Sequence, residues 1–201
     1  MMKAKAVFML LLSMAKPFLN QCGFPAHFLS PNRPPRFRST LFVAADGGAV
    51  NPLSNVGVVI LAGGSGSRMK AAVPKQFLPL ASIPIISHSL KLFTETLPSL
   101  NARPLGIAVV MNEEYRSDYT GEWLFADPGK ERQGSVENGL KVLRESLPEK
   151  EFTHVCVHDS ARPLVTVEEV IAVCRDAIAH GSAVLGVPTK STIKVRESEP
   201  L

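Results

Sequence analysis

The spacing of apolar residues changes along the chain and separates two parts of the sequence. From residue 56 onward, short apolar runs of buried-strand type alternate with stretches whose apolar residues recur at helical spacing. Strands are predicted at 56–61, 105–111, 122–126, 153–158, 182–188 and 192–195. Helices are predicted at 83–97, at 113–119, around 136–147, and from Thr166 to Gly181.

The ends of the last helix carry two recognisable signals. Thr166 and Glu169 have the spacing of a capping box, and Gly181 suits a helix terminus. Strands that are apolar on both faces and alternate with helices predict an α/β fold with a doubly wound, mostly parallel, Rossmann-like sheet. Such sheets bind ligands beyond the carboxyl ends of their strands. The loops to inspect are therefore 62–75, 127–135 and 159–163.

The first 45 residues have a different composition from the rest of the chain. They contain no Asp or Glu, are rich in Ser, Pro, Arg and Phe, and show no sustained helical or strand period. This is typical of an organelle transit peptide, although the apolar segment 6–15 behind two lysines also fits a secretory signal. The acid-free segment continues well past that apolar run, which favours a plastid transit peptide. We expect a transit peptide and disordered leader over 1–50, a domain over 51–201, and localisation in the chloroplast stroma.

The net charge of +4 resides in the leader. Residues 1–50 carry six Lys or Arg and one acidic residue, which leaves 16 basic and 17 acidic residues for 51–201. The domain itself is nearly neutral, so we expect no nucleic-acid face.

No run of about 18 apolar residues is present, which argues against a membrane-spanning helix. Three dispersed cysteines and scattered histidines argue against a disulfide scaffold and a zinc site.

The loop after the first strand is rich in glycine and carries two cations. Glycines within 63–66 let the backbone approach a ligand, and successive N–H groups can form an anion-binding concavity. Arg68 and Lys75 add positive charge that suits a triphosphate. No Gly-Lys-Ser/Thr follows, and Met69 replaces the third glycine of the dinucleotide fingerprint, which argues against a dinucleotide-dependent oxidoreductase. A tight turn with solvated basic residues is the alternative interpretation.

The other two loops carry further candidate ligands. Gly129 stands in a turn, and Gly134 and Ser135 are predicted to open a helix. Ser135 therefore lies near the helix start, where free N–H groups suit a base edge or a ribose. Asp159 ends a buried strand, where a carboxylate needs a partner such as Mg²⁺. Arg162 follows, restricted to extended conformations by Pro163. An ordinary capped helix and an Asp–Arg salt bridge are the alternatives. Together the three loops supply what nucleotidyl transfer needs.

Four segments carry a resemblance to a known family. In order and spacing, these segments resemble signatures of the 2-C-methyl-D-erythritol 4-phosphate cytidylyltransferase family: LAGGSGSRMKAAVPKQFLPL, PGKERQGSV, HDSARPLV and GVPTKSTIK. The resemblance covers about residues 56–196 and is nearest to the plant, chloroplast-targeted form. It implies a nucleotide-diphospho-sugar transferase-like fold and a divalent metal such as Mg²⁺. It also implies a reaction of CTP with methylerythritol phosphate in isoprenoid precursor biosynthesis.

The resemblance assigns roles to residues of all three loops. Transition-state stabilisation would fall to Arg68 and Lys75, and the metal would bind Asp159. The acceptor would face Arg162 and Thr192. The first loop would lay its backbone against the nucleotide, the second would hold the cytosine, and the serine of the third would touch the ribose. The nucleotide-binding residues would be Ala62, Gly63, Gly64, Gly129, Ser135, Asp159 and Ser160.

The resemblance also implies what this chain lacks. In the family the chain continues well beyond GVPTKSTIK and carries an arm that pairs two subunits into a homodimer. We therefore expect a CTP half-site here, an incomplete acceptor half-site at the C-terminus, and a homodimer only for the full-length form. Two alternatives stay open: a pentitol (ribitol) phosphate cytidylyltransferase on the same scaffold, and a non-catalytic nucleotide-binding truncated isoform.

Overall fold

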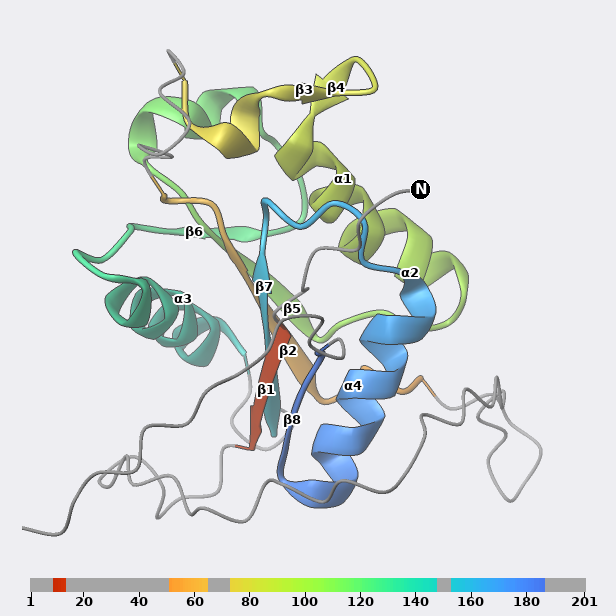
Figure 1. Cartoon of the computed structure of the whole chain (residues 1–201). Coiled ribbons are helices and arrows are strands. Elements are labelled where there is room, and N and C mark those ends of the chain that lie inside the picture. Colours follow the sequence, from red (N-terminus) through yellow and green to blue (C-terminus); the bar gives the residue numbers. More distant parts are fainter. Residues whose placement is uncertain (1–8, 14–50, 65–72, 148–152, 187–201) are drawn as a thin grey trace, which may run out of the picture.

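A computed structural model describes residues 9–13, 51–64, 73–147 and 153–186. A six-stranded sheet with the order β6-β5-β2-β7-β1-β8 runs through the described residues (Figure 1). Its strands are β1 (Met9–Ser13), β2 (Val56–Leu61), β5 (Gly106–Val110), β6 (Leu124–Ala126), β7 (His154–Asp159) and β8 (Ser182–Val184). A separate hairpin pairs β3 (Pro79–Leu80) with β4 (Ile83–Pro84).

The helices follow the predicted pattern with some differences at their boundaries. The helix predicted at 83–97 is confirmed as α1 (Ile85–Lys91), a π-helical turn over Leu92–Thr96, and α2 (Leu97–Ser99). The short helix predicted near 113–119 is a 3₁₀ helix over Glu113–Asp118. The two longer helices and a second 3₁₀ turn complete the set: α3 (Arg132–Ser146), α4 (Val167–His180) and Lys75–Phe77.

The sheet is mostly parallel and doubly wound, as predicted. Strand β2 pairs in parallel with β5 on one side and with β7 on the other, and β6 continues in parallel beyond β5. The chain runs outward from β2 through β5 to β6 and then returns to β7 on the opposite side of β2. A topological switch point therefore lies at the carboxyl ends of β2 and β7, where Leu61 and Asp159 are register partners.

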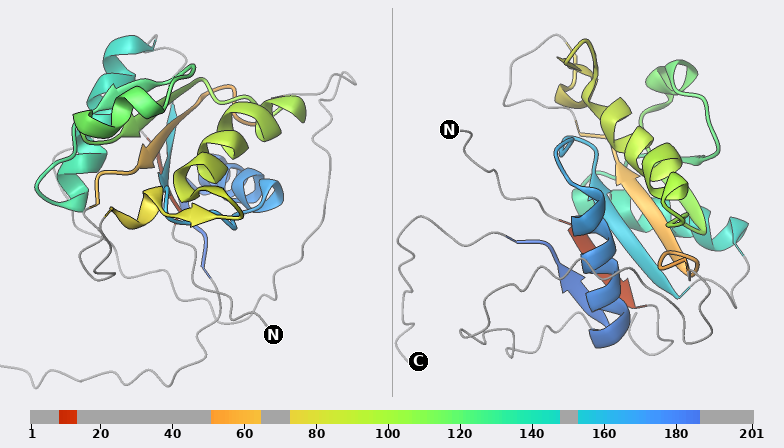
Figure 2. Two further views of the ribbon diagram at one scale, coloured as in Figure 1. Left: turned by 90° about the horizontal axis from the view of Figure 1, so that it is seen from above. Right: turned by 90° about the vertical axis from the view of Figure 1, so that its right-hand side faces the viewer.

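The helices cover both faces of the sheet and enclose two apolar cores (Figure 2). Alternate side chains of β2 point to opposite layers, as the pleat requires. Val58 and Ile60 pack with residues of α1 and α4 in the larger core. Val59 and Leu61 pack with Leu143 of α3 in the smaller one. Burial on both faces explains why β2 is uniformly apolar, and it holds the loop after β2 on a rigid support.

The start of α4 confirms the predicted capping box. The Thr166 hydroxyl accepts the Glu169 backbone N–H at 3.3 Å, and the Glu169 carboxylate accepts the Thr166 N–H at 2.9 Å. At the other end Gly181 adopts a φ of 87°, a left-handed conformation that suits glycine. Helix α4 is therefore bounded by the two residues that the sequence indicated.

One strand comes from the segment expected to be a disordered leader. Strand β1 lies between β7 and β8 and pairs antiparallel with both. Its apolar sequence MLLLS, interpreted above as part of a signal-like segment, suits a strand with neighbours on both sides equally well. The rest of 1–50 and the strand predicted at 192–195 lie outside the described residues. The boundary at residue 50 stays a prediction.

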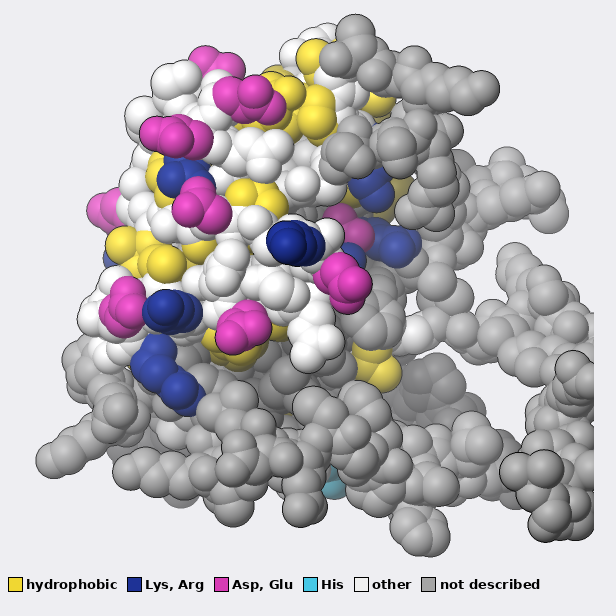
Figure 3. Space-filling model, turned by 90° about the vertical axis from the view of Figure 1, so that its left-hand side faces the viewer, with side chains coloured by type: hydrophobic (Ala, Val, Ile, Leu, Met, Phe, Trp, Pro, Cys, Tyr) yellow, Lys and Arg dark blue, Asp and Glu magenta, His cyan; other side chains and the backbone are white. Residues whose placement is uncertain are grey.

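The surface over α3 mixes charges of both signs. Figure 3 shows Lys or Arg and Asp or Glu side chains interspersed across this face, as on an ordinary solvated surface. Among the described residues, no helix has the length and apolar character needed to cross a membrane.

Candidate functional site

The candidate site lies at the carboxyl ends of β2, β6 and β7, where the loops predicted to be functional come together. Gly63, two residues after the end of β2, lies against Pro128 of the loop after β6. A Cβ atom on Gly63 would stand 2.5 Å from Cβ and Cγ of the Pro128 ring, a separation that no side chain tolerates. Glycine at position 63 therefore lets the first two loops touch.

A buried glutamine forms hydrogen bonds with the backbone of the first loop. Gln76 is only 2% exposed, and its Nε2 atom donates to the carbonyl oxygens of Ala62, at 2.6 Å, and Gly64, at 2.8 Å. The Ala62 N–H donates to the Val110 carbonyl of β5 at 2.8 Å. The turn over residues 62–64 is therefore fixed by β5 and by Gln76. The sequence interpretation did not single out Gln76, although it directly follows Lys75.

Of the two predicted cations, Lys75 lies within the described residues and Arg68 does not. Lys75 is half-buried in the 3₁₀ turn Lys75–Phe77, which also carries Gln76. This 3₁₀ turn is thus joined to the turn over 62–64 through Gln76. Arg68 lies outside the described residues, and so does Thr192. Their predicted roles stay predictions.

The loop after β6 is organised by Ser135. Its hydroxyl accepts the Gly129 N–H at 3.0 Å and donates to the Glu131 carbonyl at 3.2 Å. A Cβ on Gly129 would lie 2.5 Å from the carbonyl carbon of Gly134, so this close turn requires glycine. The predicted pair Gly129 and Ser135 is therefore brought together. Helix α3 begins at Arg132 rather than at Gly134, which places Ser135 inside its first turns.

A second contact fastens the same loop to the sheet. Arg116 donates to the Met111 carbonyl from Nη2 at 2.8 Å and from Nε at 3.1 Å, and it pairs with the carboxylate of Asp127. The Asn138 side chain of α3 donates to the Asp127 carbonyl at 2.8 Å. These residues were not predicted, because no pattern within one element signals a contact between two loops. They fix the start of the loop that carries Gly129.

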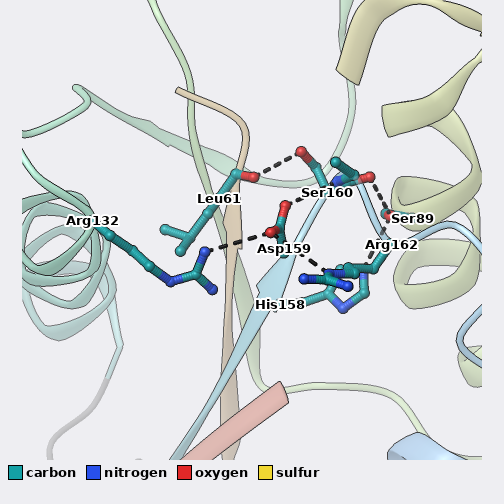
Figure 4. A network of polar contacts seen from close by, with 8 residues as sticks. Leu61, Ser89, Arg132, His158, Asp159, Ser160 and Arg162 are labelled. Carbon is teal, nitrogen blue, oxygen red and sulfur yellow. Dashed lines mark hydrogen bonds and ion pairs between the residues drawn. The ribbon is translucent and has the colours of Figure 1, made fainter. Parts of the chain in front are cut away.

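Asp159 ends β7 between two guanidinium groups (Figure 4). Its Oδ1 accepts the Ala161 N–H at 3.1 Å, while Oδ2 lies 3.4 Å from Nη1 of Arg132 and 3.8 Å from Nε of Arg162. The Asp159 side chain is 15% exposed, whereas those of Arg132 and Arg162 are 50% and 33% exposed. One carboxylate and two guanidinium groups therefore meet at this strand end, and guanidinium groups suit phosphate oxygens.

Ser160 directly follows Asp159 and links two strands through a hydrogen bond. Its side chain is 1% exposed, and its hydroxyl donates to the Leu61 carbonyl at 2.7 Å. Ser160 therefore joins the ends of β2 and β7 at the switch point. Its predicted contact with a ribose stays a prediction.

A buried network that the sequence interpretation missed supports the loop from α1. Ser89 donates its single hydroxyl hydrogen to the Ser160 carbonyl at 3.1 Å, and its oxygen lies 3.0 Å from Nε2 of His158 (Figure 4). Because that hydrogen is already used, Ser89 accepts from Nε2–H, which leaves Nδ1 of His158 unprotonated. No partner for Nδ1 occurs among the described residues. A serine at helical spacing from the buried residues Ile86 and Phe93 was the available signal.

His158 is a neutral residue of the interior. It is fully buried, and loss of solvation lowers its pKa from 6.5 to about 4. The nearby Asp159 carboxylate raises the pKa, while the Arg162 and Arg132 guanidinium groups lower it. The imidazole is therefore uncharged near neutral pH, as a group with one hydrogen-bond partner in an apolar core requires.

The donor set suits a divalent cation that is bound together with phosphate. In the part of the chain that the structure describes, no group of three or more His, Cys, Asp or Glu side chains could hold a metal. Asp159 supplies a single carboxylate at the strand end. Mg²⁺ often binds through one or two carboxylates and takes its remaining ligands from water and substrate phosphates. Asp159 fits such a site, whereas an all-protein metal cage does not fit these residues.

The sheet order and the switch-point loops define a doubly wound, Rossmann-like α/β domain. The sequence model of the 2-C-methyl-D-erythritol 4-phosphate cytidylyltransferase family matches residues 56–200. The chain belongs to this family, and the resemblance seen in its four motifs is confirmed at that level.

Individual relatives carry the same name. The chain is 47% identical over 161 residues to the chloroplastic 2-C-methyl-D-erythritol 4-phosphate cytidylyltransferase of Oryza sativa, covering 77% of this chain and 50% of the rice one. It is 40% identical over 142 residues to the Chlamydia muridarum enzyme, covering 69% and 59%. The chain thus spans about half the length of the rice relative. Among solved structures, the bifunctional IspDF from Campylobacter jejuni aligns with a TM-score of 0.45 and 26% identity, over 62% of this chain and 31% of that one.

Proposed function

We propose that the protein joins CTP and 2-C-methyl-D-erythritol 4-phosphate to give 4-diphosphocytidyl-2-C-methyl-D-erythritol and pyrophosphate. This reaction belongs to the methylerythritol phosphate pathway of isoprenoid precursor biosynthesis. Membership of the family supports the proposal. The single structural observation that carries it is the placement of Asp159 between Arg132 and Arg162 at the switch point. That cluster offers a metal ligand and positive charge where a doubly wound sheet binds phosphates.

CTP would lie across the two glycine-containing loops. Ala62, Gly63 and Gly64 would present backbone to its phosphates, and the Gly129–Ser135 loop would hold the cytosine. Ser160 would lie near the ribose. Asp159 would hold Mg²⁺, which when bound neutralises phosphate charge. The glycines at positions 63, 64 and 129 would permit close approach of the backbone to the nucleotide.

The transfer itself needs positioning and charge, not a protein nucleophile. A phosphate oxygen of the acceptor attacks the α-phosphorus of CTP, a new P–O bond forms, and the bond to the leaving pyrophosphate breaks. Negative charge grows on the α-phosphoryl oxygens and on pyrophosphate. Arg68 and Lys75 would stabilise this charge as fixed cations, and Arg162 and Thr192 would face the acceptor. A preorganised cation of this kind commonly contributes about 10²–10³ in rate.

We further propose localisation in the chloroplast stroma and a homodimer for the full-length protein. The acid-free leader and the word "chloroplastic" in the name of the rice relative support the compartment. A pentitol phosphate cytidylyltransferase is the second candidate, because Arg162 and Thr192 alone do not distinguish one sugar phosphate acceptor from another. A nucleotide-binding protein without turnover is the third.

Pyrophosphate release from CTP·Mg²⁺ tests these candidates. It is measured with methylerythritol phosphate and with ribitol phosphate, both for the 201-residue chain and for a chimera extended by the C-terminal part of the rice relative. We expect release with methylerythritol phosphate in the chimera. Release only with ribitol phosphate would assign the second candidate, and CTP binding without release would assign the third. If the protein neither binds CTP nor releases pyrophosphate, the proposed function is wrong.

A further inference from the structure

We propose that Gln76 is a positioning residue of the nucleotide site, whose side-chain amide directs the backbone of the first glycine turn toward the phosphates. The inference rests on the proposed function and deepens it. Gln76 is buried at 2% exposure and lies 12 and 14 residues along the chain from its two partners. Its Nε2 atom donates to the carbonyls of Ala62 and Gly64, at 2.6 and 2.8 Å, and so uses both amide hydrogens on one turn.

The geometry of the peptide bond gives these contacts a consequence for the ligand. The bond between Ala62 and Gly63 is trans, so its N–H points away from its C=O. Because Gln76 binds the Ala62 carbonyl, the Gly63 N–H faces away from Gln76. A backbone that approaches phosphates must present N–H groups and turn its carbonyl oxygens away, since both carbonyl and phosphate oxygens are negative. Gln76 binds the carbonyls that would otherwise repel the nucleotide.

Gln76 also joins two elements that each carry a predicted site residue. It belongs to the 3₁₀ turn Lys75–Phe77, so its contacts link the backbone beside Lys75 to the turn over 62–64. The next residue, Phe77, stacks on Tyr115 with ring centroids 4.2 Å apart, which fastens the 3₁₀ turn to the neighbouring structure. The side-chain amide of Gln76 therefore fixes the backbone at Lys75 relative to the turn over 62–64.

Only an amide of this length satisfies the position. A leucine would fill similar space but leave two carbonyl oxygens without donors, at a cost in a buried environment. A glutamate would place an ionised carboxylate against those same oxygens, unless the carboxyl group is protonated. In its protonated form it donates one hydrogen and restores one of the two bonds. Glutamate at position 76 therefore provides a pH-dependent partial rescue.

The test compares three variants of the 201-residue chain. Gln76→Leu removes both bonds, and Gln76→Glu restores one at low pH. Val173→Ala is the matched control, because it truncates a buried side chain, at 5% exposure, that belongs to α4 and not to any of the three site loops. Affinity for CTP·Mg²⁺ is measured by titration calorimetry, and the mobility of the Gly63 and Gly64 amides is measured by ¹⁵N relaxation without nucleotide.

We expect Gln76→Leu to weaken CTP·Mg²⁺ binding by at least about tenfold, and Val173→Ala by less than about twofold. The ratio of wild-type to Gln76→Glu affinity should shrink as the pH is lowered from 8 to 6. Wild-type affinity in Gln76→Leu, or equal losses in Gln76→Leu and Val173→Ala, would overturn the positioning role.

The relaxation experiment separates failure of this inference from failure of the proposed function. Order parameters near 0.85 are typical of rigid backbone, and values below about 0.6 of flexible backbone. We expect rigid Gly63 and Gly64 in the wild type and in Val173→Ala, and flexible ones in Gln76→Leu. If the wild type binds no CTP, the proposed function fails while this measurement still decides whether Gln76 fixes the turn. Unchanged order parameters in Gln76→Leu would contradict the inference.

Discussion

The hydroxyl of Ser160 donates a 2.7 Å hydrogen bond to the carbonyl of Leu61 and joins the two strands that flank the switch point. Leu61 is the register partner of Asp159, so the bond lies beside the carboxylate of the candidate site. Ser160 also accepts from Ser89 through its own carbonyl. The cluster around Asp159 therefore rests on hydrogen bonds between β2, β7 and α1.

Removing the Ser160 hydroxyl should destabilise the domain. Ser160→Ala removes the hydroxyl donor from the buried Leu61 carbonyl, which still accepts the Ser160 backbone N–H at 3.0 Å, so we expect the free energy of unfolding to fall by about 0.5–1.5 kcal/mol. Urea denaturation measures the change. Ser99→Ala is the control, because the Ser99 hydroxyl makes an exposed 2.8 Å bond to the Thr96 carbonyl, and its effect should stay within about 0.5 kcal/mol. Equal effects of the two substitutions would contradict the assigned role of Ser160.

Two glycines of the site should respond in opposite ways to alanine. Gly129→Ala places a methyl group 2.5 Å from the Gly134 backbone, so we expect a loss of about 1–3 kcal/mol in stability. Gly64→Ala meets no described atom within 4 Å and should leave stability nearly unchanged, yet it should weaken CTP·Mg²⁺ binding if backbone and phosphate are in contact. Thermal unfolding and calorimetric titration of both variants separate the effects. A large loss of stability in Gly64→Ala would show that this position is structural.

The buried His158 should make stability depend on pH. Its pKa is about 4 in the folded protein and 6.5 in the unfolded chain, so between these values only the unfolded chain binds the proton. The contribution of neutral His158 to the free energy of unfolding is complete above about pH 6.5. It is lost as the pH falls toward 4, which lowers the free energy of unfolding by up to about 3 kcal/mol. Urea denaturation at pH 7.5, 5.5 and 4.5 measures the slope. We expect His158→Gln to flatten it and His180→Gln, at the exposed end of α4, to retain it. An unchanged slope in His158→Gln would assign the effect to other groups.

Arg68 and Lys75 should affect turnover more than nucleotide affinity. In the chimera with the rice C-terminal part, we expect Arg68→Ala and Lys75→Ala each to lower kcat by about 10²–10³, because a fixed cation stabilises charge that develops in the transition state. The loss of CTP affinity should stay below about tenfold. Lys141→Ala, on the exposed side of α3, is the control and should change neither value. Equal losses in kcat/KM and affinity, with kcat unchanged, would indicate ground-state binding instead.

The sequence predicted the parallel strands well because their signal is local, whereas β1 comes from a segment expected to be a disordered leader. Uniformly apolar runs marked β2, β5 and β7, and helical spacing marked α1, α3 and α4. The rule that ligands bind at carboxyl strand ends selected three loops, and their role in ligand binding stays a prediction. Asp159 and Arg162 of the third loop lie 3.8 Å apart, which is the salt bridge named as the alternative interpretation. The start of α3 was misplaced because glycine at 134 suggested a helix opening. The Ser135 N–H already donates to the Glu131 carbonyl at 3.1 Å, so the helical pattern begins earlier.

The supporting residues could not be predicted in the same way. Ser89 and His158 are 69 residues apart in the sequence, and their contact depends on how α1 packs over β7. Gln76 reaches back across the first loop to two carbonyls, which no spacing within one element signals. Single-sequence patterns report which face of an element is buried. They do not report which buried polar groups meet across elements.

Strand β1 would give the predicted leader a second physical role, as part of the sheet. Its backbone is bonded to β7 on one side and to β8 on the other, while the chain between Ser13 and β2 belongs to the segment expected to be cleaved. A protease cut in that segment would turn β1 from part of the chain into a separate peptide. Its place in the sheet would then depend on peptide concentration, since the high effective concentration given by covalent attachment is lost. If the N-terminus is processed as predicted, its cleavage and the completion of the sheet are thermodynamically coupled.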